Sequence, residues 1–154
     1  MNHIEMVRAE FQSALDDMRE AMEQSLAEMQ DAALEDVIAF HAKFQQPVAD
    51  FPFPIEPEDA DFRARLIAEE AGELVEALES GDMTKIAQES VDLIYVALGN
   101  LVVCGLRFGP LWTIIHEANM SKQWDSDGGK PIKPPGWKPP DVAGEIARQE
   151  ELYG

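Results

Sequence analysis

The sequence predicts an all-α fold, an antiparallel bundle of helices, on the strength of three observations. Apolar residues recur every three or four positions along most of the chain, as they do on one face of a helix. No segment alternates apolar and polar residues in the manner of a half-buried strand. The breaks between most periodic segments are short, and short connections favour antiparallel neighbouring helices. We therefore expect a single helical domain in the 154-residue chain.

The first expected helix carries a methionine-rich apolar seam. Its members are Ile4, Val7, Phe11, Leu15, Met18, Met22, Leu26 and Met29. The same spacing allows the helix to continue through Val37, Phe40 and Phe44, or to break near Asp31. Because methionines at helical spacing usually belong to a core, we expect the seam to pack on the bundle or on a second subunit.

Four more helices follow a proline-rich connection. The expected elements are the connection at 45–58, helices at about 58–80, 84–104, 109–123 and 142–152, and a long irregular loop at 125–140. Gly81 suits the end of the first of these helices, and Pro110 suits the first turn of the third. Asp141 is a residue type that caps the start of a helix, here the last one.

Composition excludes some classes of partner. The formal net charge is -18, with 30 acidic against 12 basic residues, so the surface repels nucleic acid polymers and anionic membranes. Cys104 is the only cysteine, which forbids an intrachain disulfide and indicates a reducing compartment. The apolar run 90–106 is shorter than the roughly 20 residues of a membrane span, and Asp92 interrupts it. No secretory signal precedes the first helix. We expect a soluble, cytoplasmic protein.

Carboxylates gather on two of the expected helices. Glu69, Glu70 and Glu73 share one edge of the helix at 58–80, while Glu89 and Asp92 share one face of the apolar helix at 84–104. Burying an unpaired charge costs several kcal/mol, so a carboxylate in such a helix is normally paired, protonated or bound to a metal. Like charges that meet between two helices need cations, and ligand sets made only of oxygen favour Mg²⁺ or Mn²⁺ over Zn²⁺. The pattern predicts a metal site.

A basic, glycine-rich segment downstream is the expected partner of phosphate. Four of the six lysines fall there: Lys122, Lys130, Lys133 and Lys138. We interpret the segment as a loop that closes over an anion, with a solvated basic connector as the alternative. Asn119 shares a helix face with Lys122 and can contact a sugar or base edge, while Lys122 can contact a phosphate. Trp137 can stack on a base or anchor the loop to the bundle.

These motifs are similar to those of a known enzyme group. EEAGE at 69–73, ESVD at 89–92 and HEANMSK at 116–122, followed by DGGKPIKPPGWKPPD, resemble the MazG-like all-α nucleoside triphosphate pyrophosphohydrolases over about 35–142. The resemblance implies a helical bundle that forms homodimers or homotetramers and binds Mg²⁺, for which Mn²⁺ substitutes. It also implies hydrolysis of a nucleoside or deoxynucleoside triphosphate to the monophosphate and pyrophosphate, for cleaning the nucleotide pool or supplying one deoxynucleoside monophosphate.

The resemblance also assigns expected roles to single residues. The implied metal ligands are Glu70, Glu73, Glu89 and Asp92, and the implied catalytic acids are Glu69 and Glu70. Asn119 and Lys122 are the implied nucleotide-binding residues. From the loop we add Lys130, Lys138 and Trp137 as further expected substrate-binding residues. Glu69 is expected to bind metal through water or to orient the attacking water. We divide the single domain into an N-terminal helical extension at 1–33, a catalytic bundle at 35–123 and a loop with the last helix at 124–154.

Three other functions are consistent with a helical, carboxylate-rich chain. A phosphoribosyl-ATP pyrophosphohydrolase shares the fold and the metal scheme. A carboxylate-bridged di-iron bundle expects Glu-x-x-His pairs, and neither motif supplies a histidine. A non-enzymatic helical interaction module would use the apolar seam and leave the carboxylates on the surface, with Asp92 exposed.

Overall fold

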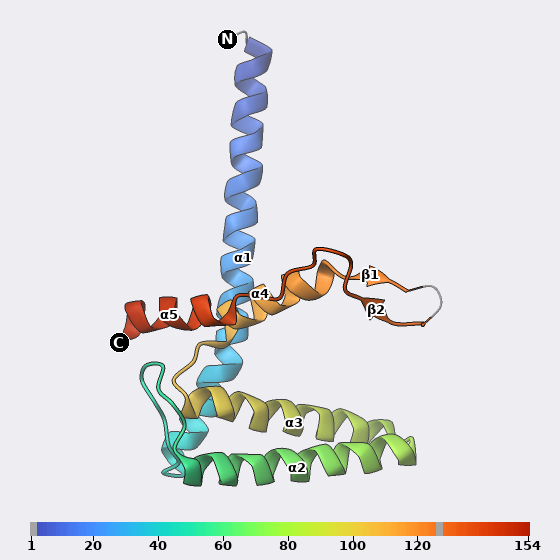
Figure 1. Ribbon diagram of the computed structural model, residues 1–154. Helices are drawn as coiled ribbons and strands as arrows, with labels where there is room; N and C mark the ends of the chain where they lie inside the picture. The colour runs from blue at the N-terminus through green and yellow to red at the C-terminus, as the bar shows by residue number, and fades with distance from the viewer. Residues whose placement is uncertain (1–2, 126–127) are drawn as a thin grey trace.

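The fold is built from helices, as the sequence predicts. The computed structural model describes the backbone of residues 3–125 and 128–154, and the side chains of these residues except 3–9, 20 and 23–30. Within these residues the elements are α1 (His3–Lys43), α2 (Pro57–Ser80), α3 (Met83–Val103), α4 (Phe108–Met120), β1 (Gln123–Trp124), β2 (Pro131–Ile132) and α5 (Val142–Tyr153) (Figure 1). The five helices confirm the all-α prediction, with bounds within a few residues of those expected for α2 to α5.

α2 and α3 form an antiparallel hairpin (Figure 1). Gly81 ends α2 with a φ of 69°, a left-handed conformation that glycine adopts without steric cost. Asp82 then caps α3, because its Oδ1 accepts hydrogen bonds from the backbone N–H groups of Thr84 at 2.9 Å and Lys85 at 3.3 Å. The turn fixes the register of the two helices and therefore the relative positions of the carboxylates that they carry.

α1 is one continuous helix that crosses the hairpin near its own C-terminal end (Figure 1). There Leu34 and Val37 pack against Leu98 and Val102 of α3, and all four are almost fully buried. The helix does not break near Asp31, whose Oδ1 instead accepts a hydrogen bond from the backbone N–H of Gly109 at 3.2 Å. This contact ties α1 to the first turn of α4, where an unpaired N–H needs a partner.

The N-terminal part of α1 projects away from the other helices (Figure 1). Four members of the apolar seam, Phe11, Leu15, Met18 and Met22, have described side chains, and all are exposed. The side chains of Ile4, Val7, Leu26 and Met29 lie outside the described residues. We expected the seam to pack either on the bundle of the same chain or on a second subunit. The bundle of the same chain does not cover the described part of the seam.

The connection between α1 and α2 is extended and is held along the end of α3. Its backbone N–H groups at Ala49 and Phe53 donate to the carbonyls of Val102 at 3.1 Å and Cys104 at 3.0 Å. Gly105 has a φ of 65°, and a Cβ at this position would clash with the backbone of Phe51. The close approach therefore requires glycine.

The C-terminal region departs from the prediction in one detail. β1 and β2 pair antiparallel, with Gln123 opposite Ile132 and Trp124 opposite Pro131, where the sequence predicts irregular chain. Strands of two residues are too short to show an alternating pattern. α5 docks on the α3–α4 junction through the buried Gln149, which accepts from the Arg107 N–H at 2.7 Å and donates to the Arg107 carbonyl at 3.3 Å. Asp141 caps α5, as expected.

α3 is long and apolar enough to cross a membrane, judged by length and composition alone, and it is the one such helix in the described part of the chain. The expectation that this region is too short rested on the run 90–106, whereas the helix itself has 21 residues. In the structure α3 packs along α2 and α1 and carries Glu89 and Asp92.

Candidate functional site

The site begins with three carboxylates that α2 and α3 bring together. Oxygen atoms of Glu70, Glu73 and Glu89 all lie within 4.8 Å of one another, which makes this group, among the described residues, one that can hold a metal ion. Glu70 and Glu89 are half-buried, and Glu73 is exposed. Oε2 of Glu89 is buried and has no hydrogen-bond partner in the described structure. Buried polar atoms are nearly always paired, so an ion at this position would satisfy an atom that the protein leaves unsatisfied.

The electrostatics of the cluster also fit a cation. Partial desolvation raises the pKa of Glu70, and repulsion from Glu73, Asp92, Glu69 and Glu89 raises it further. The pKa of Glu89 is raised first by desolvation and then by repulsion from Glu73 and Asp92. A side-chain hydrogen bond with Glu73 raises it further, while Lys85 lowers it. These residues fit a hard divalent ion, because they supply only oxygen ligands and carry unbalanced negative charge.

The raised pKa values predict how stability depends on pH and on metal. A carboxyl whose pKa is raised by folding contributes stability below its unfolded pKa and loses it as the pH rises through the folded pKa. Without divalent ions, we therefore expect the thermal midpoint to rise as the pH falls from neutral towards the ordinary glutamate pKa of about 4.5. With saturating Mg²⁺ the rise should disappear or reverse, because metal ligands must be deprotonated.

Calorimetry in EDTA and in Mg²⁺ over this pH range checks the prediction. The range stops above the region where the ion pair of Glu145 with Arg148 is lost, because Arg148 lowers the pKa of Glu145 and that pair is destabilised by acid. Equal slopes in EDTA and Mg²⁺ would show that the carboxylates do not bind the ion.

An aromatic cavity lies beside the carboxylates. It has a volume of about 400 Å³, within the range of small-molecule sites, and α1, the following connection, α2 and α3 all contribute to it. Its lining consists of Phe40, His41, Gln46, Phe62, Arg63, Leu66, Glu70, Asp92, Tyr95 and Val96. Asp92 thus faces this cavity together with Glu70, and it is not one of the three acids whose oxygens are closest together.

Contacts between the lining residues and their neighbours fix the walls of the aromatic cavity. Phe40 meets Tyr95 edge to face, with ring centres 5.5 Å apart. His41 is 2% exposed, and its Nδ1 lies 2.8 Å from the carbonyl oxygen of Pro47. A carbonyl can only accept, so Nδ1 carries a proton, and Nε2 is left as an acceptor in the neutral ring.

A second, polar hollow lies on the other side of the cluster. Glu73 and Glu89 line it together with Glu76, Ala77, Lys85 and Gln88, and its volume is about 520 Å³. The cluster therefore separates an aromatic cavity from a polar hollow that contains a lysine. Glu69, the remaining predicted acid, is exposed and close enough to repel Glu70.

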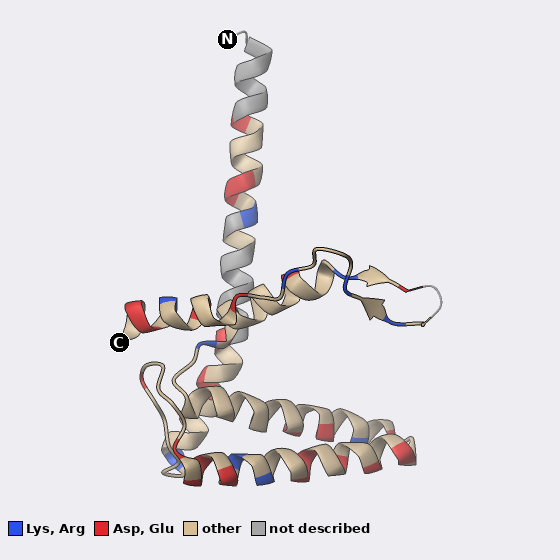
Figure 2. Cartoon of the chain, viewed as in Figure 1, with Lys and Arg blue, Asp and Glu red and all other residues tan. Residues whose placement is uncertain are grey.

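The predicted nucleotide-binding residues downstream lie elsewhere in the chain. Figures 1 and 2 show the end of α4 and the lysine-bearing segment after it well separated from α2 and α3. Lys122 Nζ donates to Asn119 Oδ1 at 2.8 Å, so these two do share a helix end. Lys130 and Lys138 are exposed. None of the described residues of this region lines either cavity beside the carboxylates.

Trp137 anchors the loop to α4. Its Nε1 donates to the carbonyl of Ala118 at 3.0 Å, and Lys133 Nζ lies 4.5 Å from the centre of its ring. Of the two expected roles for this tryptophan, the structure contains the anchoring contact.

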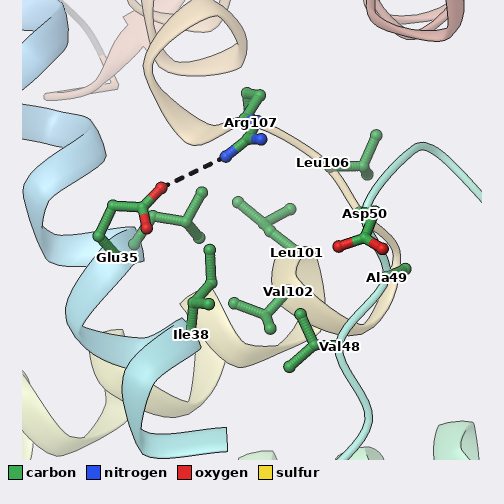
Figure 3. Close-up of a pocket in the computed structure, with 11 residues that line it drawn as sticks. Glu35, Ile38, Val48, Ala49, Asp50, Leu101, Val102, Leu106 and Arg107 are labelled. Carbon is green, nitrogen blue, oxygen red and sulfur yellow. Dashed lines mark hydrogen bonds and ion pairs between the residues drawn. The ribbon is translucent and has the colours of Figure 1, made fainter. Parts of the chain in front are cut away.

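A third cavity, of about 210 Å³, lies between α1, the proline-rich connection and the α3–α4 junction (Figure 3). Arg107 and Glu35 at its edge pair with each other, with Nη1 and Oε1 3.4 Å apart. Apolar side chains such as Ile38 and Leu101 make up much of the rest. It contains no carboxylate cluster, so we place the candidate site at the α2–α3 hairpin.

Comparison with known proteins agrees with this placement. A profile of the phosphoribosyl-ATP pyrophosphohydrolase family matches residues 37–119, just over half of the chain, and the match contains all five predicted acids. A comparison with curated proteins returns no significant match. The chain belongs to the phosphoribosyl-ATP pyrophosphohydrolase family, within the MazG-like all-α superfamily of pyrophosphohydrolases that act on nucleotide phosphoanhydrides.

Proposed function

We propose that the protein hydrolyses a nucleoside or deoxynucleoside triphosphate to the monophosphate and pyrophosphate, using Mg²⁺ or Mn²⁺. The observation that carries the proposal is the meeting of Glu70, Glu73 and Glu89 between two helices, with a buried, unsatisfied oxygen on Glu89. A triphosphate is itself strongly anionic, so an acidic site can hold it only with cations between the two. Pyrophosphohydrolase activity on a nucleotide is the activity that the family implies.

The two cavities suggest how the substrate lies. The aromatic cavity suits the nucleoside, because Phe40, Phe62 and Tyr95 offer ring surface for a base. The polar hollow suits the pyrophosphate end, since Lys85 supplies a positive charge there. The scissile bond between the α- and β-phosphates then lies over the carboxylates that separate the two cavities.

The acidic residues have distinct roles in this scheme. Glu70, Glu73, Glu89 and Asp92 hold the metal, and Glu69, exposed at the edge of the cluster, orients the attacking water. A bound divalent ion supplies charge neutralisation and lowers the pKa of a bound water. The water oxygen forms a bond to the α-phosphorus, the bond to the bridging oxygen breaks, and pyrophosphate leaves with that oxygen.

We further propose that a second copy of the chain completes the site. Asn119, Lys122, Lys130 and Lys138 are the expected nucleotide-binding groups of the downstream region. The end of α4 and the segment after it, which carry these residues, lie apart from the α2–α3 hairpin of the same chain, and this separation favours supply to a neighbour's site (Figure 2). The accessible surface of 11259 Å² exceeds the about 7,800 Å² expected for a compact monomer of the same mass. Both hairpin helices also leave apolar residues exposed, such as Leu78 and Ile94.

Phosphoribosyl-ATP is the second candidate substrate, because the matched family takes its description from that activity. It presents the same phosphoanhydride and a substituted adenine base, which the aromatic cavity also suits. A non-enzymatic module fits less well, since the carboxylates converge and Asp92 is half-buried.

A single panel of reactions tests the proposal. The protein is incubated with Mg²⁺ or Mn²⁺ and each common nucleoside and deoxynucleoside triphosphate, and with phosphoribosyl-ATP. The products are separated by chromatography, and pyrophosphate and phosphate are assayed separately. Monophosphate and pyrophosphate, both lost with EDTA, are the expected products. Diphosphate and phosphate would mean that a different bond is cleaved, and turnover of phosphoribosyl-ATP alone would select the second candidate.

A further inference from the structure

Arg63 is a buried charge for which the scheme above has no role. The residue is 6% exposed and lies on α2 seven residues before Glu70, on the same face of the helix. Among the described side chains, no carboxylate lies within ion-pair distance of its guanidinium, although Arg63, Glu70 and Asp92 all line the aromatic cavity. A buried arginine without a carboxylate partner is costly, so its position calls for an explanation.

The guanidinium is held firmly but is not saturated. Nε donates to Asn100 Oδ1 at 2.9 Å, and Nη2 donates to the Val96 carbonyl. Nη1 makes no hydrogen bond to any described residue. An arginine has five N–H donors in a rigid plane, so donors remain available at the wall of the cavity.

The helix opposite is shaped around this side chain. A Cβ at Gly99 would lie 2.8 Å from Cζ and 2.9 Å from Nη1 of Arg63. Both separations are too short for real contacts, so glycine leaves the space that the guanidinium fills. Asn100 and the Val96 carbonyl then fix the plane of the group. Fixed donors beside a binding cavity are typical of a group that selects a ligand.

We propose that Arg63 selects the base of the substrate, favouring a base with a carbonyl oxygen at position 6 of a purine or position 4 of a pyrimidine. Arginine can only donate, so it pairs with a carbonyl oxygen and meets an amino group at the same position unfavourably. The substrate class is then guanine, uracil or thymine nucleotides over adenine or cytosine nucleotides. This inference rests on the proposed function, because it takes the aromatic cavity to be the nucleoside site.

Two substrate pairs test it, each exchanging a carbonyl for an amino group at one ring position. The ratio of kcat/KM is measured for dGTP against dATP and for dUTP against dCTP. In the natural protein kcat/KM should be about tenfold or more higher for the substrate with the carbonyl group. We expect this preference in the purine pair or in the pyrimidine pair, according to which ring size the cavity accepts. Arg63→Met should bring that ratio close to one, mostly through loss on the carbonyl substrate.

Two further variants separate selection from a structural role. Arg65→Met removes an exposed arginine two residues away and should leave the ratio unchanged. Gly99→Ala keeps the Arg63 charge but displaces the guanidinium, so it should lower the ratio as well. Gly99→Ala also tests the inference if circular dichroism shows that Arg63→Met does not fold. A purely structural arginine would lower kcat/KM equally for both members of a pair.

The outcomes distinguish this inference from the proposed function. The inference would be overturned, and the proposed function kept, by either of two results. One is faster hydrolysis of the nucleotide with the amino group. The other is a kcat/KM ratio that neither Arg63→Met nor Gly99→Ala changes. If no nucleotide is hydrolysed, binding of the α,β-methylene analogues is measured by calorimetry in Mg²⁺. If the analogue with a carbonyl group binds more tightly and Arg63→Met removes that difference, Arg63 selects the base even though the protein is not a hydrolase. Binding without base preference, or no binding, would overturn it.

Discussion

Glu89→Gln is expected to abolish metal-dependent hydrolysis and, at the same time, to raise the thermal midpoint of the metal-free protein. The amide keeps the shape of the side chain but loses the charge that attracts a cation. Even outer-shell partners of a metal site cost about 10- to 100-fold in affinity or activity, so loss of a direct ligand should lower kcat/KM by at least about 100-fold. The stability effect has the opposite sign, because the charged Glu89 is repelled by Glu73 and Asp92.

Opposite effects on activity and stability separate a metal ligand from a structural carboxylate. Loss of a structural carboxylate would lower both. Calorimetry in EDTA measures the midpoint, and the pyrophosphate assay measures activity. Glu79→Gln is the matched control, since Glu79 is an exposed acid near the end of α2, outside the cluster, and should change neither quantity. Near-normal activity in Glu89→Gln would remove Glu89 from the site.

Asp92→Asn refines the ligand set. Asp92 faces the aromatic cavity with Glu70 and raises the pKa of both Glu70 and Glu89, yet its oxygens are not among the closest three. As a ligand, it should be needed for turnover, and Asp92→Asn should be inactive with its helical content unchanged. Full activity would reduce the ligands to the three clustered glutamates.

Local patterns predicted the helices, and the meeting of acids from two of them, because both depend on short-range spacing. Glu70 and Glu73 are three residues apart and must share a helix face, as must Glu89 and Asp92. The turn at Gly81 then makes the two faces meet. The sequence left the continuity of α1 open near Asp31, although no glycine or proline precedes Pro47. The short β1–β2 pair was not predictable, because two-residue strands show no period.

The sequence alone did not predict the aromatic cavity, because the cavity depends on the crossing of two helices that are far apart in the chain. Phe40 and His41 come from α1, and only its packing over α3 brings them to Glu70 and Asp92. A partial signal was available. Arg63 lies two helical turns before Glu70, so an examination of the same face further along α2 would have found it.

If a second copy completes the site as proposed, replacing Val91 and Ile94 by glutamate is expected to leave monomers of 17.1 kDa. Activity should then fall by about tenfold or more, because positioned phosphate contacts are lost. These two side chains lie three residues apart on α3 and are 60% and 57% exposed. Exposed apolar residues on the helix that carries Glu89 and Asp92 are costly in water unless another surface covers them. Two glutamates in each copy would place like charges within such an interface.

The effect on activity follows from where the basic groups lie. The hairpin of one chain carries the carboxylates. The end of α4 and the segment after it, which carry Asn119 and Lys122, lie apart from that hairpin (Figure 1). If a second copy supplies these groups, a monomer binds metal but loses contacts to the phosphates. We therefore expect the double variant to retain the stabilisation by Mg²⁺ and to lose turnover.

Light scattering and calorimetry in Mg²⁺ measure the two properties separately. Leu152→Glu is the control, because Leu152 on α5 is 58% exposed and lies outside the hairpin. If that variant dissociates instead, the interface lies on α5. A double variant that is monomeric yet fully active would show that one chain holds a complete site, and Lys85 would then be the principal cation facing the phosphates. Loss of both oligomer and activity, with metal binding intact, would establish that α3 both carries the ligands and joins the copies.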